Sequence, residues 1–354
     1  MISIFEKKKK VGILTGGGDC PGLNAVLRAV VRRALSYGGY EIIGIKHGWR
    51  GLIEKETMIL DRAAVRGILY RGGTILGTSR TNLFKDKQTT DRAYSNFEKL
   101  GLHALIAVGG EDTLTVAAKL FEHHLPVVGI PKTIDNDLKG TDFTFGFDTA
   151  VEIATEAIDR LHTTAESHDR VLVCEVMGRH AGWIATYAGL AGGADAILIP
   201  EKPIDIDEVC EMIWQRHQQG VYFSIIVVAE GAKIKEGQLQ KEILSSEKKD
   251  EFGHAQLGGI GQVLAKEIEK RTDYDTRVTV LGHVQRGGTP TAADRVLATR
   301  YGVAAMDAVH AQRFGVMVAL HGKDIVEMPL KEISTGIKTV DDDLYELTKT
   351  FWGY

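Results

Sequence analysis

The stretch VGILTGGGDCPGLNAVLRAVVRRALS, residues 11–36, contains the pattern that decides the fold. It begins with a short apolar run at 11–14, continues through a glycine-rich turn at 16–22, and ends in a segment with helical periodicity at 24–36. An apolar run, a turn and an amphipathic segment in this order predict a strand followed by a helix.

The same order of strand, polar or glycine-rich turn and helix recurs along the chain. Further strands are expected at 104–108, 126–130, 171–176, 196–199, 223–229 and 278–281, and helices at 113–123, from about 181, at 205–219 and at 292–309. Strands that alternate with helices predict an α/β fold, in which parallel sheets are covered by helices and ligands bind at the carboxyl ends of the strands.

Length and composition limit the class of protein. The chain has 354 residues, enough for two domains with their own cores, and the longest expected helix, 149–167, is where we expect the second domain to begin. The formal net charge is −4, so the basic surplus typical of nucleic-acid-binding proteins is missing. We therefore expect no nucleic-acid partner.

The sequence also favours a cytoplasmic protein without a membrane partner. The longest largely apolar run, 222–229, has eight residues, against about 20 needed to span a bilayer. The first ten residues end in four lysines and no apolar segment follows them, unlike a secretory signal. Cys20, Cys174 and Cys210 are scattered, so they predict neither a disulfide framework nor a metal site.

Three glycines at 16–18 form the first candidate site. Bare backbone amides at the start of a helix suit an anion such as phosphate. However, Leu23 stands where a P-loop has its lysine, and Pro21 interrupts the dinucleotide-binding fingerprint. A phosphate site and a plain turn both remain open.

Gly109-Gly110-Glu111-Asp112-Thr113 is the second candidate site. Its two carboxylates could stabilise the start of a helix, where acidic residues are favoured. Alternatively, Glu111 could supply a hard oxygen ligand for magnesium beside a backbone that binds phosphates.

The third candidate site is PKTIDND, residues 131–137, directly after an expected buried strand. It brings Lys132, Thr133, Asp135 and Asp137 into six residues. A carboxylate here could accept the proton of a substrate hydroxyl while the lysine neutralises phosphate charge. We therefore favour a catalytic role over a surface turn.

Basic residues lie at several expected strand ends, and Glu230 follows the run 223–229. The basic residues are Arg170, Arg179, His180, Arg277, His283 and Arg286. Together they predict a pocket for the phosphate and hydroxyl groups of an anionic sugar.

In this order the motifs resemble those of the 6-phosphofructokinase family. The motifs are TGGGDCPGLN (15–24), GTSR (77–80), GGED (109–112), PKTIDND (131–137), HDR (168–170), EVMGR (175–179), Glu-Gly (230–231), TRVTVLGHVQRGG (276–288) and Asp-Arg (294–295). The resemblance implies magnesium-dependent phosphoryl transfer to the 1-hydroxyl of fructose 6-phosphate, a step of glycolysis or gluconeogenesis.

The resemblance also implies an architecture. We expect two Rossmann-like three-layer αβα domains with mostly parallel sheets and an active site in the cleft between them. The donor domain is expected at 1–146 plus about 285–335, and the sugar-phosphate domain at about 147–284 plus 336–354. A homodimer or homotetramer is expected, because Arg170 and Arg277 match arginines that reach the neighbouring subunit's site.

Roles for the remaining residues follow from the same resemblance. Asp135 would be the general base, with Thr133 and Asp137 beside it, and Glu111 would engage Mg²⁺. Arg179 would stabilise the transferring phosphoryl group. Residues expected to contact the sugar phosphate are Met177, Gly178, Glu230, His283 and Arg286, and those expected to contact the donor phosphates are Gly18 and Arg80.

Two positions point to the donor. Asp112 and Lys132 replace glycines of the common ATP-using pattern, and this pair resembles the diphosphate-dependent branch of the family. Glycine lets a nucleotide approach the backbone, whereas a like-charge pair at ~4 Å costs about 4 kcal/mol at an effective dielectric constant of 20. We therefore expect inorganic diphosphate as donor and a reversible reaction.

Several alternatives remain open at this stage. The nearest is an ATP-dependent 6-phosphofructokinase, and sedoheptulose 7-phosphate is not excluded as a sugar substrate. Kinases of NAD or diacylglycerol share a Gly-Gly-acid turn but lack PKTIDND and HVQRGG. A non-catalytic sugar-phosphate sensor would not need Asp135 and Arg179.

Weak or absent allosteric regulation is also expected. Arg28 and Arg32 fit the start of the family's effector site. The later basic positions of that site fall on His162, Gln219 and Val221, where strong positive charge is missing.

Overall fold

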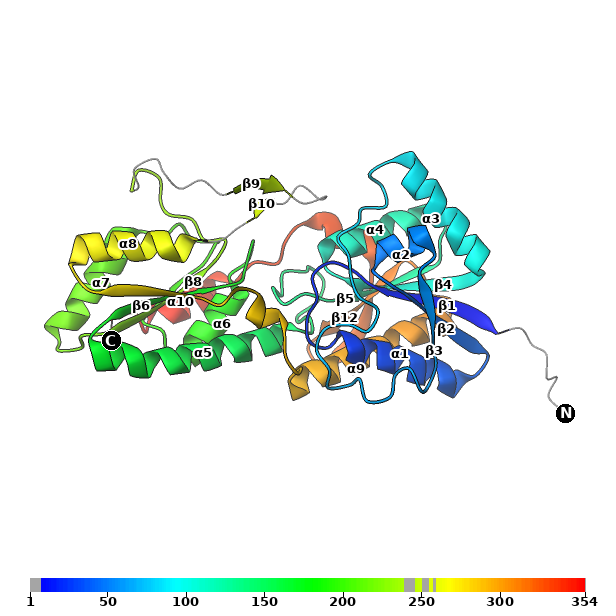
Figure 1. Ribbon diagram of the computed structural model, residues 1–354, viewed down its shortest axis with the longest axis horizontal. Coiled ribbons are helices and arrows are strands. Elements are labelled where there is room, and N and C mark those ends of the chain that lie inside the picture. The colour runs from blue at the N-terminus through cyan, green and yellow to red at the C-terminus, as the bar shows by residue number, and fades with distance from the viewer. Residues whose placement is uncertain (1–7, 239–245, 250–254, 257–258, 354) are drawn as a thin grey trace.

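The computed structural model describes residues 8–238, 246–249, 255–256 and 259–353. Two lobes lie side by side along the long axis of the molecule (Figure 1). One lobe contains a seven-stranded sheet in the order β13-β12-β5-β4-β1-β2-β3, and the other a four-stranded sheet in the order β11-β6-β8-β7. The sequence-based prediction of an α/β fold is confirmed.

In the first lobe the strands are parallel except for the two at the edges, β3 and β13, which are antiparallel to their neighbours. The strands are β1 (Lys9–Thr15), β2 (Tyr40–Ile45), β3 (Thr57–Leu60), β4 (Leu102–Gly109), β5 (Val127–Pro131), β12 (Val316–His321) and β13 (Asp324–Pro329). One face packs against α1 (Leu23–Tyr37) and α9 (Ala292–His310), and the other against α2 (Trp49–Glu54), α3 (Lys87–Leu100) and α4 (Glu111–Glu122).

In the second lobe all four strands are parallel. They are β6 (Val171–Val176), β7 (Ala196–Leu198), β8 (Ser224–Ala229) and β11 (Thr276–Val280). One face packs against α5 (Phe147–His168) and α6 (Trp183–Ala191), and the other against α7 (Ile206–Gln218) and α8 (Ile260–Thr272). Both lobes therefore have the expected three layers.

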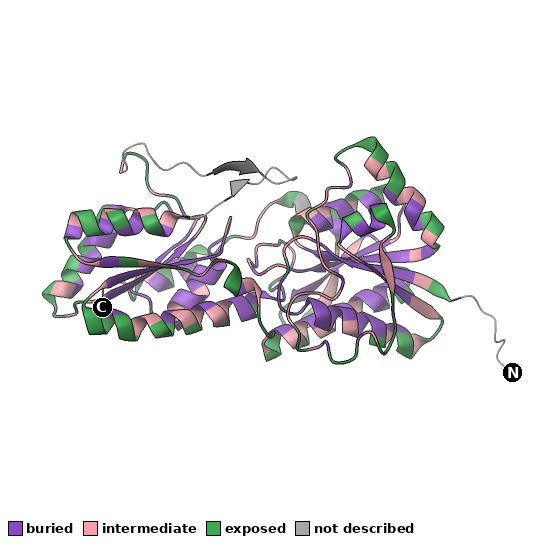
Figure 2. Cartoon of the chain, in the orientation of Figure 1, coloured by how far each residue is buried: buried purple, intermediate pink, exposed green. Residues whose placement is uncertain are grey.

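Burial follows directly from this layering. Every residue of β6 and of β8 is buried, as expected for a parallel sheet with helices on both faces. Figure 2 shows buried residues concentrated in the sheets and on the helix faces turned toward them. One buried cluster includes residues of both lobes, among them Ile134, Phe147 and Trp183, so the lobes share part of their core.

The chain passes between the lobes three times within its described part. It leaves the first lobe where α5 begins, and returns after β11 through the short 3₁₀ helix η1 (Gly282–Arg286) and α9. It leaves again after the 3₁₀ helix η2 (Leu330–Thr335) to form α10 (Asp342–Lys349), which contacts α6 and β7. A small hairpin of β9 (Ser246–Lys249) and β10 (Ala255–Gln256) completes the described elements.

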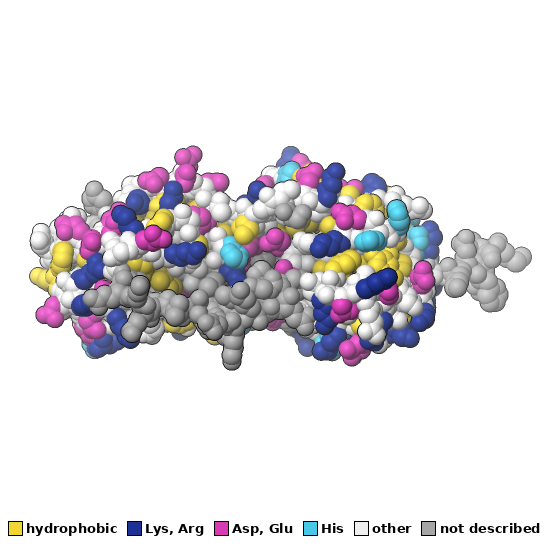
Figure 3. All heavy atoms as spheres, turned by 90° about the horizontal axis from the view of Figure 1, so that it is seen from above, with side chains coloured by type: hydrophobic (Ala, Val, Ile, Leu, Met, Phe, Trp, Pro, Cys, Tyr) yellow, Lys and Arg dark blue, Asp and Glu magenta, His cyan; other side chains and the backbone are white. Residues whose placement is uncertain are grey.

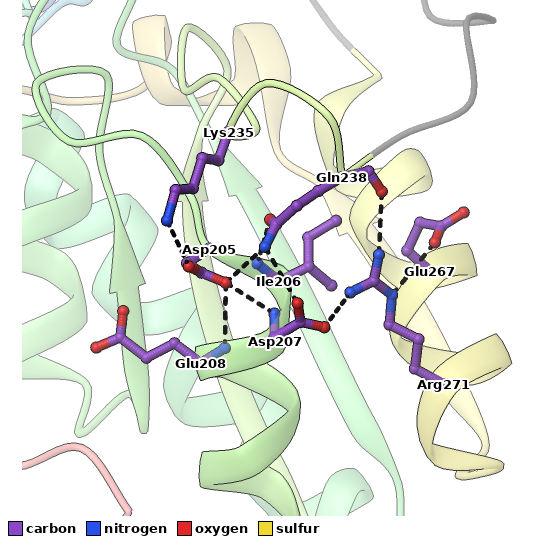
Figure 4. Close-up of polar contacts among 8 residues, drawn as sticks. All are labelled: Asp205, Ile206, Asp207, Glu208, Lys235, Gln238, Glu267 and Arg271. Atoms are coloured by element: carbon purple, nitrogen blue, oxygen red, sulfur yellow. Dashed lines mark hydrogen bonds and ion pairs between the residues drawn. The ribbon is translucent and has the colours of Figure 1, made fainter.

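A polar network around Asp205 fixes the start of α7 in the second lobe (Figure 4). The Asp205 carboxylate accepts hydrogen bonds from the backbone N–H of Asp207 at 3.1 Å, from Lys235 Nζ at 3.1 Å and from Gln238 Nε2 at 2.7 Å. The hydrogen bonds from Gln238 and Lys235 lower the pKa of Asp205 to about 2. Arg271 of α8 bonds both Asp207 and the Gln238 carbonyl oxygen, so the network joins α7, α8 and the segment before residue 239.

No described helix combines the length and apolar character needed to cross a membrane. On the face drawn in Figure 3, basic and acidic side chains are interspersed over both lobes.

Candidate active site

The glycine-rich loop after β1 is held between two neighbouring segments. A Cβ on Gly16 would lie 2.6 Å from Thr113 Oγ1, so this position requires glycine. The Gly17 carbonyl oxygen accepts a hydrogen bond from Thr78 Oγ1 at 2.6 Å, and its N–H donates to the Ser79 carbonyl oxygen at 3.1 Å. The loop is therefore fixed by α4 on one side and the GTSR segment on the other.

Two cations reach this loop. Lys132, which follows β5 and is 3% exposed, donates from Nζ to the Gly18 carbonyl oxygen. Arg286, the last residue of η1, also lies beside the loop, because a Cβ on Gly18 would be 3.3 Å from its Nη1. Burial lowers the pKa of Lys132. A glycine loop with two adjacent cations suits a phosphate anion.

The second glycine pair leads into α4. The N-cap of α4 is Gly110, and no side chain caps the helix there. Glu111, which is exposed, and Asp112, which is partly exposed, form its first turn, where negative charge is favoured by the helix dipole.

Asp135 lies in the loop after β5 and receives positive charge from both lobes. Its Oδ1 is buried without a hydrogen-bond partner among the described residues, and its backbone N–H donates to Thr133 Oγ1 at 3.1 Å. Burial raises the pKa of this carboxyl group, whereas the positive charges of Arg286, Lys132 and Arg179 lower it. The result is a desolvated carboxylate with nearby cations, as a general base requires.

Two further carboxyl groups lie near Asp135. Burial, together with the charges of Asp135 and Glu111, raises the pKa of Asp137 to about 7, and the charge of Lys338 acts in the opposite direction. Burial also raises the pKa of Glu230, which follows β8 in the second lobe, and the charge of Asp135 adds to this. The site is therefore built from both lobes.

The second lobe presents backbone turns after β6 and β8. Gly178 has φ +140°, and a Cβ there would lie 2.9 Å from the Ala181 carbonyl oxygen. The Gly231 N–H donates to the Gly178 carbonyl oxygen at 3.1 Å, which joins the ends of the two strands. The Met177 N–H donates to Gln285 Oε1 at 3.3 Å, which attaches the β6 end to η1.

Arg80 and His283 are exposed, at the end of the GTSR segment and within η1 respectively. Arg170 and Arg277 lie elsewhere, at the amino ends of β6 and β11. Both pair with Asp275, at 2.5 Å each. At about 3.3 Å per residue, β6 puts roughly 20 Å between Arg170 and the Met177 end, so one chain does not bring these two arginines into its own site.

Sequence reasoning missed three residues that position the site. Thr113 contacts the glycine loop, Gln285 is fully buried and holds Met177, and Lys338 contacts the loop of Asp135. Thr113 and Gln285 lie inside motifs that the sequence had singled out. Lys338 lies in no motif, so the sequence offered no signal for it.

The described residues contain no group of three or more histidine, cysteine or acidic side chains able to hold a metal ion. Mg²⁺ is typically bound by one or two carboxylates together with substrate phosphates, rather than by an all-protein cage. Glu111 is exposed, and its charge raises the pKa of Asp137, so the two carboxyl groups lie close enough to interact. The carboxylate of Glu111 therefore fits such a site.

Known proteins resemble the chain over nearly its whole length. The family model described as "Phosphofructokinase" matches residues 10–309. A pyrophosphate--fructose 6-phosphate 1-phosphotransferase of Streptomyces coelicolor is 59% identical over 345 residues, 97% of this chain and 100% of that protein. ATP-dependent 6-phosphofructokinase 3 of the same organism is 53% identical over 336 residues, 95% of this chain and 98% of that protein.

The fold also matches a solved structure. Phosphofructokinase from Saccharomyces cerevisiae superimposes with a TM-score of 0.79 at 35% sequence identity. The match covers 97% of this chain and 46% of that one, so this chain spans a little less than half of its length.

Proposed function

The chain belongs to the phosphofructokinase family, and we propose that it transfers a phosphoryl group reversibly between inorganic diphosphate and the 1-hydroxyl of fructose 6-phosphate. The observation that supports this most strongly is Asp135, whose buried Oδ1 has no hydrogen-bond partner within the described part of the chain and which has cations from both lobes around it. A relative that is 59% identical carries the name of this reaction.

In the forward direction Asp135 would accept the proton of the 1-hydroxyl. The oxygen would then bond to the nearer phosphorus of diphosphate, the bridging P–O bond would break, and orthophosphate would leave. Arg179 and Lys132 would neutralise the charge that develops on the transferring group. Thr133, whose Oγ1 accepts the Asp135 N–H, would hold the base in place.

The sugar phosphate would bind on the second lobe. Met177, Gly178 and Glu230 follow β6 and β8 and would line the sugar, while Arg286 and His283 of η1 would hold its 6-phosphate.

A divalent metal is expected for this family, and we propose Mg²⁺ held by Glu111 and the donor phosphates. When bound, the ion would neutralise phosphate charge. Asp137, next to Asp135 and sensitive to the charge of Glu111, would complete the acidic side of the site.

The donor choice rests on Gly18, Arg80, Asp112 and Lys132. Asp112 adds a negative charge in the first turn of α4, which disfavours the additional phosphate of a nucleotide. Lys132 places its ammonium beside the glycine loop, where a small diphosphate would lie. The carboxylate of Asp112 and the ammonium of Lys132 together therefore favour diphosphate, the smaller donor.

A donor comparison on one purified preparation tests the proposal. Fructose 6-phosphate and Mg²⁺ are incubated with diphosphate or with ATP, and fructose 1,6-bisphosphate is measured. We expect kcat/KM with diphosphate to be at least about a hundredfold higher. A preference for ATP would overturn the donor assignment, and no product with either donor would favour a sugar-phosphate sensor.

The second candidate is an ATP-dependent 6-phosphofructokinase. It is favoured by the relative of that name, which is 53% identical over 95% of this chain. The same comparison of donors decides between the two.

We further propose the domain division expected from the sequence, 1–146 plus about 285–335 and about 147–284 plus 336–354. This division follows the two sheets, with α10 joining the second. A cytoplasmic location is part of the proposal, because Cys20, Cys174 and Cys210 are buried, unpaired thiols of the kind common in reducing compartments.

The proposal includes a homodimer or homotetramer. Strand β11 is an edge strand of the second sheet, and Val280 and Val284 beside it are 52% and 62% exposed. An open edge with exposed apolar residues favours contact with a second copy. Arg170 and Arg277 would then reach the neighbouring copy's site.

Weak or absent allosteric regulation also remains part of the proposal. His162 already contacts the Gly192 carbonyl oxygen through Nε2 at 2.6 Å, and the nearby Arg216 is buried in an ion pair with Asp195 at 2.8 Å. At the later positions of the expected effector site, these contacts leave little positive charge to add to Arg28 and Arg32 for an anionic effector.

A further inference from the structure

Lys338 lies in the segment that crosses from the first lobe to the second for the last time (Figure 1). It is outside residues 10–309, the part matched by the family model. Its backbone N–H donates to the Asp137 carbonyl oxygen at 2.8 Å, and its carbonyl oxygen accepts from Trp183 Nε1 at 2.9 Å. Because Trp183 is the first residue of α6, the backbone of Lys338 joins the loop of Asp135 to the second lobe.

The Lys338 side chain binds the same loop a second time. Nζ lies 3.1 Å from Asn136 Oδ1, 3.0 Å from the Thr141 carbonyl oxygen and 2.7 Å from the Asp142 carbonyl oxygen. Three acceptors match the three protons of an ammonium group. The Trp183 ring centroid is 5.2 Å from Nζ, which adds a cation–π contact from the second lobe.

Asn136 connects Lys338 to the candidate active site. It stands between Asp135 and Asp137, is fully buried, and has φ +50°, a left-handed conformation that its surroundings must hold. Its Oδ1 accepts from the Thr144 N–H at 3.1 Å as well as from Lys338 Nζ. These donors therefore hold Asn136, whose backbone joins Asp135 to Asp137.

The segment is attached to the second lobe at a further point. The Val340 N–H donates to Glu201 Oε1 at 2.9 Å, and the same carboxylate accepts from the Gly182 N–H at 3.0 and 3.1 Å. Residues 338–340, here called the strap, are thus bonded directly to both sides of the site.

We propose that Lys338 is a positioning residue, which locks the loop carrying Asp135 against the second lobe through the strap. This inference rests on the proposed function, in which Asp135 is the general base. Lys338 would affect the chemical step more than substrate affinity, since its contacts are to the loop of the base rather than to the residues assigned to the sugar phosphate.

Lys338→Met tests this assignment, because methionine keeps an unbranched stem and removes all three donors. We expect kcat to fall about tenfold to a hundredfold, as small misplacements of a catalytic group do, with KM for fructose 6-phosphate changed less than about threefold. The matched control is Lys349→Met, since Lys349 lies 5.2 Å from a tryptophan ring centroid and pairs with Glu208, yet does not contact the loop. The control should keep wild-type kcat.

The pH profile gives a second readout. Burial lowers the pKa of Lys338 to about 8, whereas the charges of Asp142, Asp137 and Asp341 act to raise it. Among the described residues, the aromatic rings of Trp183 and Phe143 also face its ammonium group. Wild-type kcat should therefore fall as the pH rises through about 8. Lys338→Met should lack this limb and keep only the loss that titration of Lys132 causes in both proteins, because burial lowers the pKa of Lys132 as well. The same fall of kcat near pH 8 in the wild type and in Lys338→Met would contradict the positioning role of Lys338.

Trp183→Phe removes the indole N–H that bonds the Lys338 carbonyl oxygen and keeps an aromatic ring. It therefore tests the positioning role of Lys338 if Lys338→Met does not fold. We expect a smaller loss of kcat, about threefold, in the same direction. If the wild type makes no product with either donor, the proposed function fails. If the wild type is active but Lys338→Met has the same kcat as the control, the positioning role of Lys338 is wrong. If Lys338→Met does not fold, the same conclusion follows from Trp183→Phe having the kcat of the control.

Discussion

Asp135 is the carboxyl group that interacts with cations of both lobes. Burial raises its pKa and so favours the protonated acid, whereas the charges of Arg286, Lys132 and Arg179 lower its pKa and favour the carboxylate. Replacing it with asparagine keeps the shape and removes the base. We expect Asp135→Asn to lower kcat about 10²- to 10⁴-fold, the usual contribution of a general base, measured with diphosphate at saturating substrates.

The control for this variant is Asp324→Asn, because Asp324 is exposed in β13, outside the site. It should leave kcat unchanged, and both variants should keep the wild-type melting temperature. Turnover by Asp135→Asn within threefold of the wild type would remove Asp135 from the mechanism and revive the sensor hypothesis.

Asp112 and Lys132 together set the donor preference in our proposal. Changing both to glycine removes the acid from the first turn of α4 and the ammonium from the glycine loop. We expect KM for diphosphate to rise about tenfold or more and the ratio of ATP to diphosphate activity to increase. Initial rates with both donors measure this, and an unchanged ratio would contradict the steric and electrostatic argument.

At the residue scale, prediction from sequence succeeded where chemistry is concentrated in a short motif. Lys132, Thr133, Asp135 and Asp137 lie within six residues, so their grouping needs no knowledge of the fold. Lys338 could not be predicted, because its contact with Asn136 joins positions 202 residues apart and depends on how the last crossing between the lobes is folded.

At the scale of helices and strands, the buried βα units were predictable because their strands are short apolar runs. The strand pairs at the sheet edges were not: β13 is only partly buried, and β2 pairs with an antiparallel β3 that carries the exposed Ile59. Helix α3 was also missed, because only Ala93, Asn96 and Phe97 are buried among its polar residues. Partial burial weakens the hydrophobic period on which such prediction depends.

Two elements from different lobes are joined by Asp294. It lies in the first turn of α9, and its Oδ2 accepts from the Thr149 N–H at 2.8 Å and from Thr149 Oγ1 at 2.5 Å, near the start of α5. Burial raises the pKa of Asp294 from 3.8 to about 6. A group with a raised pKa binds its proton more tightly in the folded state, so its contribution to stability is complete below about 3.8 and is lost as the pH rises through about 6.

Asp294→Asn should therefore flatten the dependence of stability on pH between about 4 and 6. A change of about two pKa units corresponds to about 3 kcal/mol, which is the upper size of the effect. Melting temperatures of the wild type and the variant at pH 4.5 and 6.5 measure it. Equal changes with pH in both proteins would show that Asp294 titrates at its ordinary pKa.

At the scale of the whole molecule, the direction of the strands separates two groups of candidate site residues. The site residues gather where the carboxyl ends of β5, β6 and β8 face each other, whereas Arg170 and Arg277 lie at the opposite end of the second sheet. The pattern of basic residues at strand ends placed both groups in one pocket, and only the family resemblance assigned Arg170 and Arg277 to a neighbouring subunit's site. Their positions at the amino ends of β6 and β11 separate them from Met177 and Glu230, which follow the carboxyl ends of β6 and β8.

Hybrid dimers test whether these arginines serve a neighbouring copy. Asp135→Asn and Arg277→Ala are co-expressed with different tags, and the hybrid is purified through both. One of its sites contains both defects and the other contains neither, because each site would take Asp135 from one chain and Arg277 from its neighbour. The hybrid should regain about half of the wild-type kcat, while each variant alone stays far below it. If Arg277 acted within its own chain, both sites of the hybrid would be defective and no activity would return.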